Sequence, residues 1–385
     1  MKFPKRRSLN IKTIFSLLGY LFKSFISGND PGYHGKPYKL YTKKLEKYYG
    51  VDNAIPVCSG TNAIYLALKS LQLKGNQFVY VSPISDPGTF SAICENNYET
   101  KILDTKTFSG NASPESLDVI AEKNGGAILL VHHAGWHADI NEFRKLSVKY
   151  NLPLIQDFSQ SHGYNSSFSN NMIENEIAVF STMYRKSQSS GGSGGFIITN
   201  SNILGNSIRS LSDRGKFIAN NGKWLSISRN GNEINFPSLN HCLDDISCVL
   251  AIESLQNLDR TIKKRLEFNY ALYRSLKNLS NLVHTPKPLP STSPFIIPIS
   301  LINNENEFFS KKKLSEYLFS FDIPHNPNYQ FLSTEWEWLK PYVKEAYSKN
   351  AKDYIERTIF LYVNERYKNY HANFIYEKLR NFFLR

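Results

Sequence analysis

The chain has few cysteines, and they do not form a pattern. Its 385 residues include four, Cys58, Cys94, Cys242 and Cys248, and no two of them form a C-x-x-C pair. Their spacing suggests no disulfide framework. We therefore expect a cytosolic protein with reduced thiols. In such a protein, cysteines ordinarily pack in the interior as small hydrophobic side chains.

Near the N-terminus the chain lacks an apolar run long enough to cross a bilayer. The stretch TIFSLLGYLF ends at Lys23 after ten residues, whereas a crossing takes about 20. No A-x-A-like cleavage site follows, which argues against a signal peptide. Apolar residues recur at helical spacing: Ile11, Ile14, Phe15, Leu18, Leu21, Phe22 and Phe25. The spacing predicts an amphipathic helix that packs on the protein body or a partner subunit, with an anionic membrane surface as the alternative.

Acidic residues are in the minority. The chain has 33 Asp and Glu against 46 Lys and Arg, a net charge of +13. This charge suits an anionic partner such as a phosphorylated small molecule, nucleic acid or a membrane surface. The sequence has no recognisable nucleic-acid module, so a non-enzymatic DNA-binding regulator is a minor alternative that rests on charge alone. The basic stretches KKRLEF and SKKKLSEY are typical of solvated helix faces.

The length allows roughly two domains. From Pro56 to Thr199, short apolar runs alternate with helical patterns, which predicts an α/β fold with a mostly parallel sheet covered on both faces. The predicted strands are QFVYVS, KILD, AILLV, LPLIQD, IAVFS and GFIIT. We expect a basic N-terminal segment over 1–30, a large cofactor domain over 31–255 and a small C-terminal α/β domain over 256–385, which contains the strand FIIPISL.

The first of three polar clusters beside predicted strand ends is Ser59-Gly60-Thr61. It opens a predicted helix, whose N-terminus offers free N–H groups and positive dipole to a phosphate. A simple helix cap is the alternative interpretation.

The second cluster is QDFSQSHG. Asp157 ends an apolar strand, and Gln160 and His162 follow it. A carboxylate there is costly unless it is paired with a cation. We interpret it as a partner for a protonated ring nitrogen, or else as a cap of the next segment.

The third cluster is FSTMYRK. Ser181 ends a strand, Lys186 follows five residues later, and a glycine-rich segment returns the chain to the next strand. A lysine can bond covalently to an aldehyde, and burial lowers its pKa enough for attack. Glycines let the backbone pass close to a bulky ring. The alternative is a solvated surface lysine. Together, a phosphate cradle, a carboxylate and a lysine predict a pyridoxal-phosphate site.

In their order and spacing these motifs resemble the DegT/DnrJ/EryC1/StrS family of pyridoxal-phosphate-dependent sugar aminotransferases, of fold type I. The resemblance runs from about Tyr41 to Tyr367. It rests on VCSGTNAIYLAL, LLVHHAGWHADINEF, QDFSQSHG, FSTMYRK, RSLSDRG, LNHCLDDISCVLAIESLQNLD and FLYVNERY.

The resemblance implies a role for each matching residue. Gly60, Thr61 and Ser181 would bind the cofactor phosphate, Asp157 its pyridinium nitrogen and Gln160 its ring. Lys186 would be the catalytic lysine that bonds to the cofactor. Asn240 would reach the cofactor phosphate of the partner subunit in a homodimer.

The same resemblance implies a transaminase, which we expect in the cytoplasm. The apolar face of the N-terminal helix and the basic residues near it add a second hypothesis, peripheral contact at the inner membrane. It would move an amine from glutamate to a nucleotide-linked keto-deoxysugar, for lipopolysaccharide or another surface polysaccharide. Related sugar dehydratases carry histidine in place of the lysine. Because Lys186 is a lysine, transamination is the first hypothesis and dehydration the alternative.

The chain departs from the family pattern in several places. ISDPGTF stands where the family has a Thr-Phe pair that places an aromatic near the ring, GSGG replaces G-[ED]-G-G, and Cys242 replaces an arginine. His132, His133 and His137 share no helical face, so we expect packing or a place near the substrate rather than a metal site.

Overall fold

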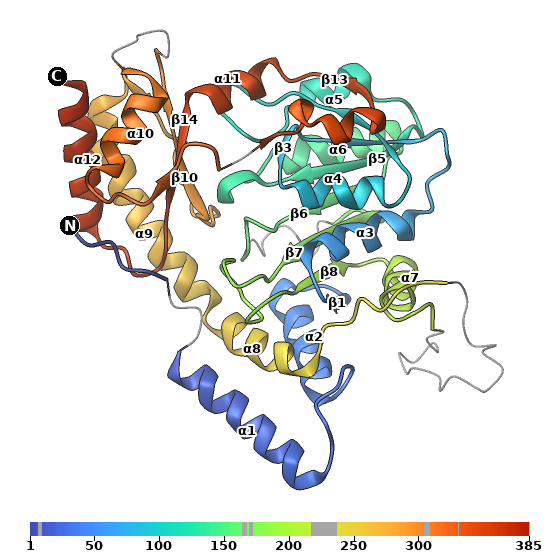
Figure 1. Cartoon of the computed structure of the whole chain (residues 1–385). Helices are drawn as coiled ribbons and strands as arrows, with labels where there is room; N and C mark the ends of the chain where they lie inside the picture. Colours follow the sequence, from blue (N-terminus) through green and yellow to red (C-terminus); the bar gives the residue numbers. More distant parts are fainter. Residues whose placement is uncertain are drawn as a thin grey trace.

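An eight-stranded sheet forms the centre of the larger part of the molecule (Figure 1). The computed structural model describes residues 1–6, 10–163, 168, 172–216, 237–303, 309–329 and 331–384. The strand order is β1-β8-β7-β6-β5-β2-β4-β13. The strands are β1 (Asn53–Val57), β2 (Phe78–Val81), β4 (Glu99–Ile102), β5 (Gly126–Val131), β6 (Leu154–Asp157), β7 (Glu176–Ser181), β8 (Gly195–Thr199) and β13 (Val343–Ala346).

Six of these strands run parallel, as predicted. Each pair from β13 through β4, β2, β5 and β6 to β7 is parallel, whereas β8 is antiparallel to both β7 and β1. The expected α/β fold with a mostly parallel sheet is confirmed. The strand β1 was not predicted, because Pro56 interrupts it and proline disfavours central strands. As an edge strand, β1 tolerates this residue.

Helices cover both faces of the sheet, which is why its strands are apolar throughout. Val79 and Val81 of β2 face a core shared with one helix group, and Tyr80 faces the other core. On the first face lie α3 (Gly60–Leu71), α4 (Pro87–Cys94) and α7 (Asn202–Ser212). On the second lie α2 (Lys36–Tyr49), α5 (Pro114–Ile120), α6 (Ile140–Tyr150) and α8 (Asp245–Gln256).

A second, antiparallel sheet lies in the C-terminal part, in the order β11-β14-β10-β9. Its strands are β9 (Val283–His284), β10 (Ile296–Leu301), β11 (His325–Asn326) and β14 (Thr358–Tyr362). The predicted strand FIIPISL is β10. The helices of this part are α9 (Leu258–Leu276), α10 (Lys311–Phe319), α11 (Lys349–Arg357) and α12 (Asn369–Phe383). Short 3₁₀ turns are η1 (His133–Gly135), η2 (Lys277–Leu279), η4 (Ser333–Glu335) and η5 (Glu337–Tyr342).

Two strands from the C-terminal part of the chain pair with strands of the larger part. The C-terminal part supplies β13 to the large sheet, and β12 (Phe331–Leu332) pairs with β3 (Ile84–Ser85) beside the strand ends. The predicted long helical region breaks at Asn257, between α8 and α9. We propose the domain boundary near residue 255 because this break lies beside it.

The predicted N-terminal helix is α1 (Ile11–Ser27), which lies at the edge of the molecule beside α8 (Figure 1). Its polar face contacts α8: Ser16 Oγ donates to Glu253 Oε1 at 3.1 Å. Its apolar side chains are largely exposed, for example Phe15 at 66%. The expectation that this face packs on the body of its own chain is therefore wrong. No helix among the described residues is long and apolar enough to span a bilayer.

Candidate active site

A pocket of about 280 Å³ lies where the polar clusters meet. The carboxyl ends of parallel neighbours reach the same edge of a sheet, so the residues that follow β6 and β7 converge there with the start of α3. Six of the seven predicted site residues line it: Gly60, Thr61, Asp157, Gln160, Ser181 and Lys186. The seventh, Asn240, does not.

The start of α3 forms one wall of this pocket. Ser59 caps the helix, and its Oγ accepts from Asn62 N at 3.0 Å. The first N–H groups of a helix have no acceptor within the helix, so those of Gly60 and Thr61 are available to an anion. A Cβ on Gly60 would lie 2.6 Å from Ser181 Cβ. Glycine therefore allows α3 to approach β7 and brings the Ser181 hydroxyl to the same wall.

Asp157 ends β6 at the floor of the pocket and is 5% exposed. Its Oδ1 accepts from Ser159 N at 2.9 Å. Burial raises the pKa of Asp157, and the Ser159 hydrogen bond and the Lys186 charge oppose that rise. The carboxylate therefore lies in a low-dielectric position where a cationic partner would stabilise it strongly.

Lys186 reaches the pocket from a tight loop. Burial lowers the pKa of its ammonium group, while Asp157 and Asp86 oppose the shift. Its Nζ lies 4.7 Å from the centroid of the Phe295 ring. A lowered pKa increases the neutral amine, which is the nucleophilic form.

The glycine-rich segment doubles back along the lysine loop. Thr182 N donates to Gly194 O at 2.7 Å, and Tyr184 N donates to Gly192 O at 2.9 Å. Gly191 has φ +96°, a conformation that L residues rarely adopt, and a Cβ there would clash with Leu250. The glycines thus let the chain turn back beside Lys186.

A network of charged side chains holds the back of this loop. Arg6 Nη1 donates to Tyr184 O at 3.1 Å, and Arg265 Nη1 donates to Ser187 Oγ at 3.0 Å. Both arginines pair with Glu365. Arg265 is 1% exposed, so the interpretation of KKRLEF as a solvated face is wrong at this residue. Sequence reasoning missed the network because its members are far apart in the chain.

Gln160 connects the pocket to η1. Its Oε1 accepts from Ala134 N at 2.8 Å. His132 Nδ1 accepts from Ala138 N at 3.1 Å, which leaves the Nε2 proton to be donated to Gln156 Oε1 at 3.0 Å.

The neighbouring histidines are also packing residues. Burial lowers the pKa of both His133 and His137 to about 3. The His133 ring contacts Tyr354 and Phe360. These histidines are therefore neutral near pH 7.

The segment ISDPGTF supplies polar atoms to the wall of the pocket. Asp86 caps α4 by accepting from Gly88 N at 2.9 Å, and Asp86 and Thr89 line the pocket. Phe90 is fully buried and packs edge-on against Trp336. This segment therefore places no aromatic ring in the pocket.

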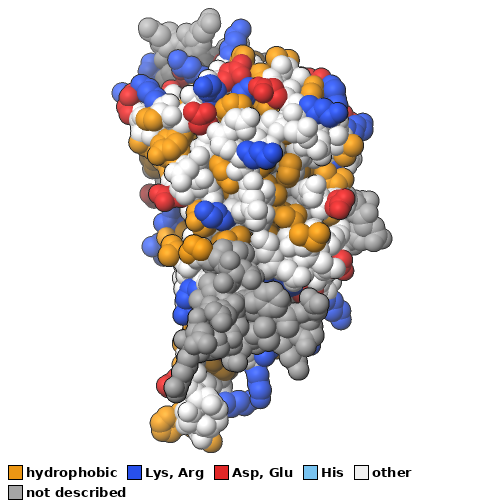
Figure 2. Space-filling model, turned by 90° about the vertical axis from the view of Figure 1, so that its right-hand side faces the viewer, with side chains coloured by type: hydrophobic (Ala, Val, Ile, Leu, Met, Phe, Trp, Pro, Cys, Tyr) orange, Lys and Arg blue, Asp and Glu red, His pale blue; other side chains and the backbone are white. Residues whose placement is uncertain are grey.

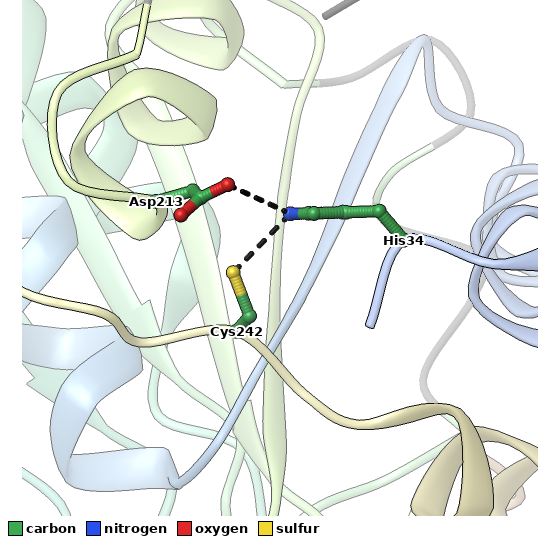
Figure 3. A group of neighbouring side chains, drawn as sticks. All are labelled: His34, Asp213 and Cys242. Atoms are coloured by element: carbon green, nitrogen blue, oxygen red, sulfur yellow. Dashed lines mark hydrogen bonds and ion pairs between the residues drawn. The ribbon is translucent and has the colours of Figure 1, made fainter. Parts of the chain in front are cut away.

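Three potential metal ligands, His34, Asp213 and Cys242, lie together (Figure 3). Asn240 is next to them, because it forms an isolated β-bridge with Asp213. His34 Nε2 is 3.2 Å from Cys242 Sγ and 3.5 Å from Asp213 Oδ2. Asp213 already pairs with Arg214 at 2.9 Å and Lys216 at 2.7 Å. These two positive charges disfavour a cation, and the cluster instead ties the segments around Asn240 together.

A second pocket, of about 610 Å³, lies next to the lysine loop. Tyr184, Arg185 and Phe295 line it, and Phe295 also contacts Lys186. Its other lining residues are Lys5, Arg6, Ile296, Tyr329, Tyr362, Val363 and Asn364. The pocket thus combines aromatic rings with basic side chains.

The chain resembles known proteins over most of its length. Residues 26–380 match the model of the DegT/DnrJ/EryC1/StrS aminotransferase family. The chain is 25% identical over 356 residues to the UDP-4-amino-4,6-dideoxy-N-acetyl-beta-L-altrosamine transaminase of Campylobacter jejuni, covering 90% of this chain and 89% of that protein.

Two solved structures share the fold. One is Helicobacter pylori PseC, an aminotransferase involved in the biosynthesis of pseudoaminic acid, with TM-score 0.83, 20% identity and 97% coverage of each chain. The other is the E. coli GDP-4-keto-6-deoxy-D-mannose-3-dehydratase with bound hydrated PLP, with TM-score 0.85, 19% identity and coverage of 97% of this chain and 98% of that one.

Proposed function

Because the chain belongs to the DegT/DnrJ/EryC1/StrS aminotransferase family, we propose that it transfers an amine from glutamate to the keto group of a nucleotide-linked deoxysugar. It is a transaminase, and its cofactor is pyridoxal 5′-phosphate. We infer that its product serves lipopolysaccharide or another surface polysaccharide, since a Bacillus subtilis relative, 24% identical over 254 residues, is named as a spore coat polysaccharide biosynthesis protein. The convergence of six predicted residues on one pocket carries the proposal.

The pocket fits the cofactor by its donors and by its shape. We propose that the α3 N-terminus, Thr61 and Ser181 hold the phosphate, as amides and hydroxyls beside a helix dipole would. Asp157 would face the ring nitrogen, and Gln160 would lie beside the ring. Gly60 leaves room where a side chain would collide with Ser181.

Lys186 is our proposed catalytic residue. When bound, the cofactor supplies an aldehyde for covalent capture of amines and a ring that withdraws electrons from the neighbouring carbon. The Lys186 amine, with its lowered pKa, would accept a proton from one carbon and return it to another. The Asp157 carboxylate would keep the ring nitrogen protonated, and the buried pocket would limit access of water.

The second pocket is our candidate for the nucleotide. Its aromatic rings suit stacking by a base, and its basic side chains suit a pyrophosphate. Arg185 lines the pocket, whereas Arg214 is paired with Asp213. Lys and Arg side chains are spread over the face shown in Figure 2, so the total charge by itself marks no binding site there.

A substrate panel tests the acceptor class. The purified enzyme should aminate keto-deoxysugars linked to UDP, GDP or dTDP with glutamate as donor, and should leave the same free sugars and ordinary 2-oxo acids unchanged. Activity confined to 2-oxo acids would make it a general amino-acid aminotransferase. Loss of a sugar hydroxyl with no amine gained would favour the dehydratase alternative.

Arg185→Ala should raise KM for the nucleotide sugar about tenfold, because a charge-assisted contact to the pyrophosphate is lost. The half-reaction with glutamate should keep its rate, since glutamate carries no nucleotide. Arg380→Ala, an exposed change on α12, is the matched control. If Arg185→Ala impaired the glutamate half-reaction as much as the nucleotide-sugar reaction, Arg185 would instead stabilise the conformation of the lysine loop.

We also propose a cytoplasmic homodimer with shared sites. Asn240 is exposed and lies outside the pocket of its own chain. Its Oδ1 accepts from Cys242 N at 3.1 Å, which orients the side chain. A second subunit would be needed to bring Asn240 to a cofactor.

Complementation tests this assembly. Asn240→Ala and Lys186→Ala should each be weak or inactive alone. When they are co-expressed with different tags and isolated as the mixed dimer, about half of the sites should regain both residues. A mixed dimer no more active than the Asn240→Ala homodimer, or a fully active monomer, would contradict shared sites.

A further inference from the structure

The helix α1 is turned the opposite way from an ordinary surface helix. Its polar face lies against the protein, where Lys12 Nζ is 3.2 Å from Glu253 Oε2 and Tyr20 OH is 3.5 Å from Asp245 Oδ2. Thr13 is the buried residue of the helix. A helix that packs by its apolar stripe would show the reverse arrangement.

The outward face of α1 is a continuous apolar surface. Seven large side chains are 44% to 84% exposed: Ile11, Ile14, Phe15, Leu18, Phe22, Phe25 and Ile26. At 100° per residue they fall within an arc of about 120°. A shallow groove also runs along the helix between Phe15 and Phe25. Contiguous apolar surface of this kind marks an interaction site.

The charge beside this surface favours an anionic partner. Lys23 on α1 and Lys36 and Lys39 at the start of α2 are exposed, against one exposed acidic residue, Asp30, on the connection between the two helices. Two copies that met through α1 would set these like charges against each other. An anionic lipid surface would attract them and would accept the apolar side chains between its headgroups.

Most of this surface precedes the family match. That match begins at residue 26, whereas six of the seven side chains lie between Ile11 and Phe25. The surface is also separate from the pocket that contains Lys186, because none of the seven side chains lines that pocket.

We propose that α1 lies in the plane of an anionic bilayer, with its apolar face inserted at the headgroup level and its polar face attached to α8. With 17 residues, the helix is about 25 Å long at 1.5 Å per residue. It would hold the enzyme peripherally, without crossing the membrane.

Vesicle co-sedimentation of the full-length holoenzyme tests this. Binding to vesicles of phosphatidylglycerol and phosphatidylethanolamine (3:7) should exceed binding to phosphatidylcholine vesicles at least tenfold and should fall in 1 M NaCl. Phe15→Ser/Phe22→Ser should lower anionic-vesicle binding at least tenfold. The control Val148→Ser/Ile203→Ser, which alters equally exposed apolar residues on α6 and α7, should bind as the wild type does.

Two outcomes would overturn the proposal. One is equal, weak binding of the unmodified enzyme to both kinds of vesicle, a result that needs no variant to fold. The other is a Phe15→Ser/Phe22→Ser protein of lower oligomeric mass by light scattering with unchanged vesicle binding. That result would assign the face to a second copy of the chain.

Discussion

Replacing Lys186 by alanine should lower kcat for transamination at least a thousandfold. Proton transfer by a positioned side chain contributes about 10² to 10⁴ in rate, and the covalent hold on the cofactor is lost as well. Borohydride reduction of the wild-type holoenzyme should fix pyridoxal phosphate to Lys186, detectable by peptide mass spectrometry. The variant should carry no such label.

Two comparisons make this test specific. Lys74→Ala removes an exposed lysine and should leave rate and label unchanged. Because burial lowers the pKa of Lys186, covalent attachment should begin at a lower pH than for an exposed lysine. Wild-type protein that takes up no pyridoxal phosphate, or a label on another lysine, would refute the assignment.

Replacing Asp157 by asparagine should lower kcat about 10²- to 10³-fold, because the amide cannot stabilise a positive charge on the ring nitrogen. The fold should survive. An asparagine Oδ1 can still accept from Ser159 N, the hydrogen bond that Asp157 makes. The cofactor absorption spectrum should change with the loss of ring protonation, and the glutamate half-reaction should slow.

Asp245→Asn is the matched control for that change. Asp245 is also a buried aspartate whose pKa burial raises, but it lies on α8 outside the pocket. Its variant should keep the wild-type kcat. If kcat of Asp157→Asn stays within threefold of wild type and its spectrum is unchanged, Asp157 does not act on the ring nitrogen.

The pocket was predictable because each of its walls is encoded locally. Gly60 and Thr61 follow a helix cap, Asp157 and Ser181 end apolar strands, and Lys186 follows within one loop. In a parallel sheet the carboxyl ends of neighbouring strands meet at one edge. Predicting the strands therefore also predicted where these side chains converge.

The strand β13 escaped prediction for the opposite reason. Its sequence, VKEA, has no apolar pattern, and two of its residues are exposed. It pairs with β4, more than 200 residues away in the chain. Hydrophobic periodicity is read within a short window of sequence, so it cannot indicate a pairing between strands that are so far apart in the chain.

Strand and helix periodicity was enough to predict the α/β fold and the amphipathic character of α1. The polar motifs at the ends of those elements were enough to predict the family and which six residues line one pocket. The chemical role of each of these residues stays a prediction.

Tertiary structure alone decided how distant segments meet. It brought Arg6, Arg265 and Glu365 together behind Lys186 and set Phe295 over its amine. It also turned the polar side of α1 toward α8 through Glu253. Helical periodicity reveals that two faces differ, but the groups on the packing neighbour decide which face is buried.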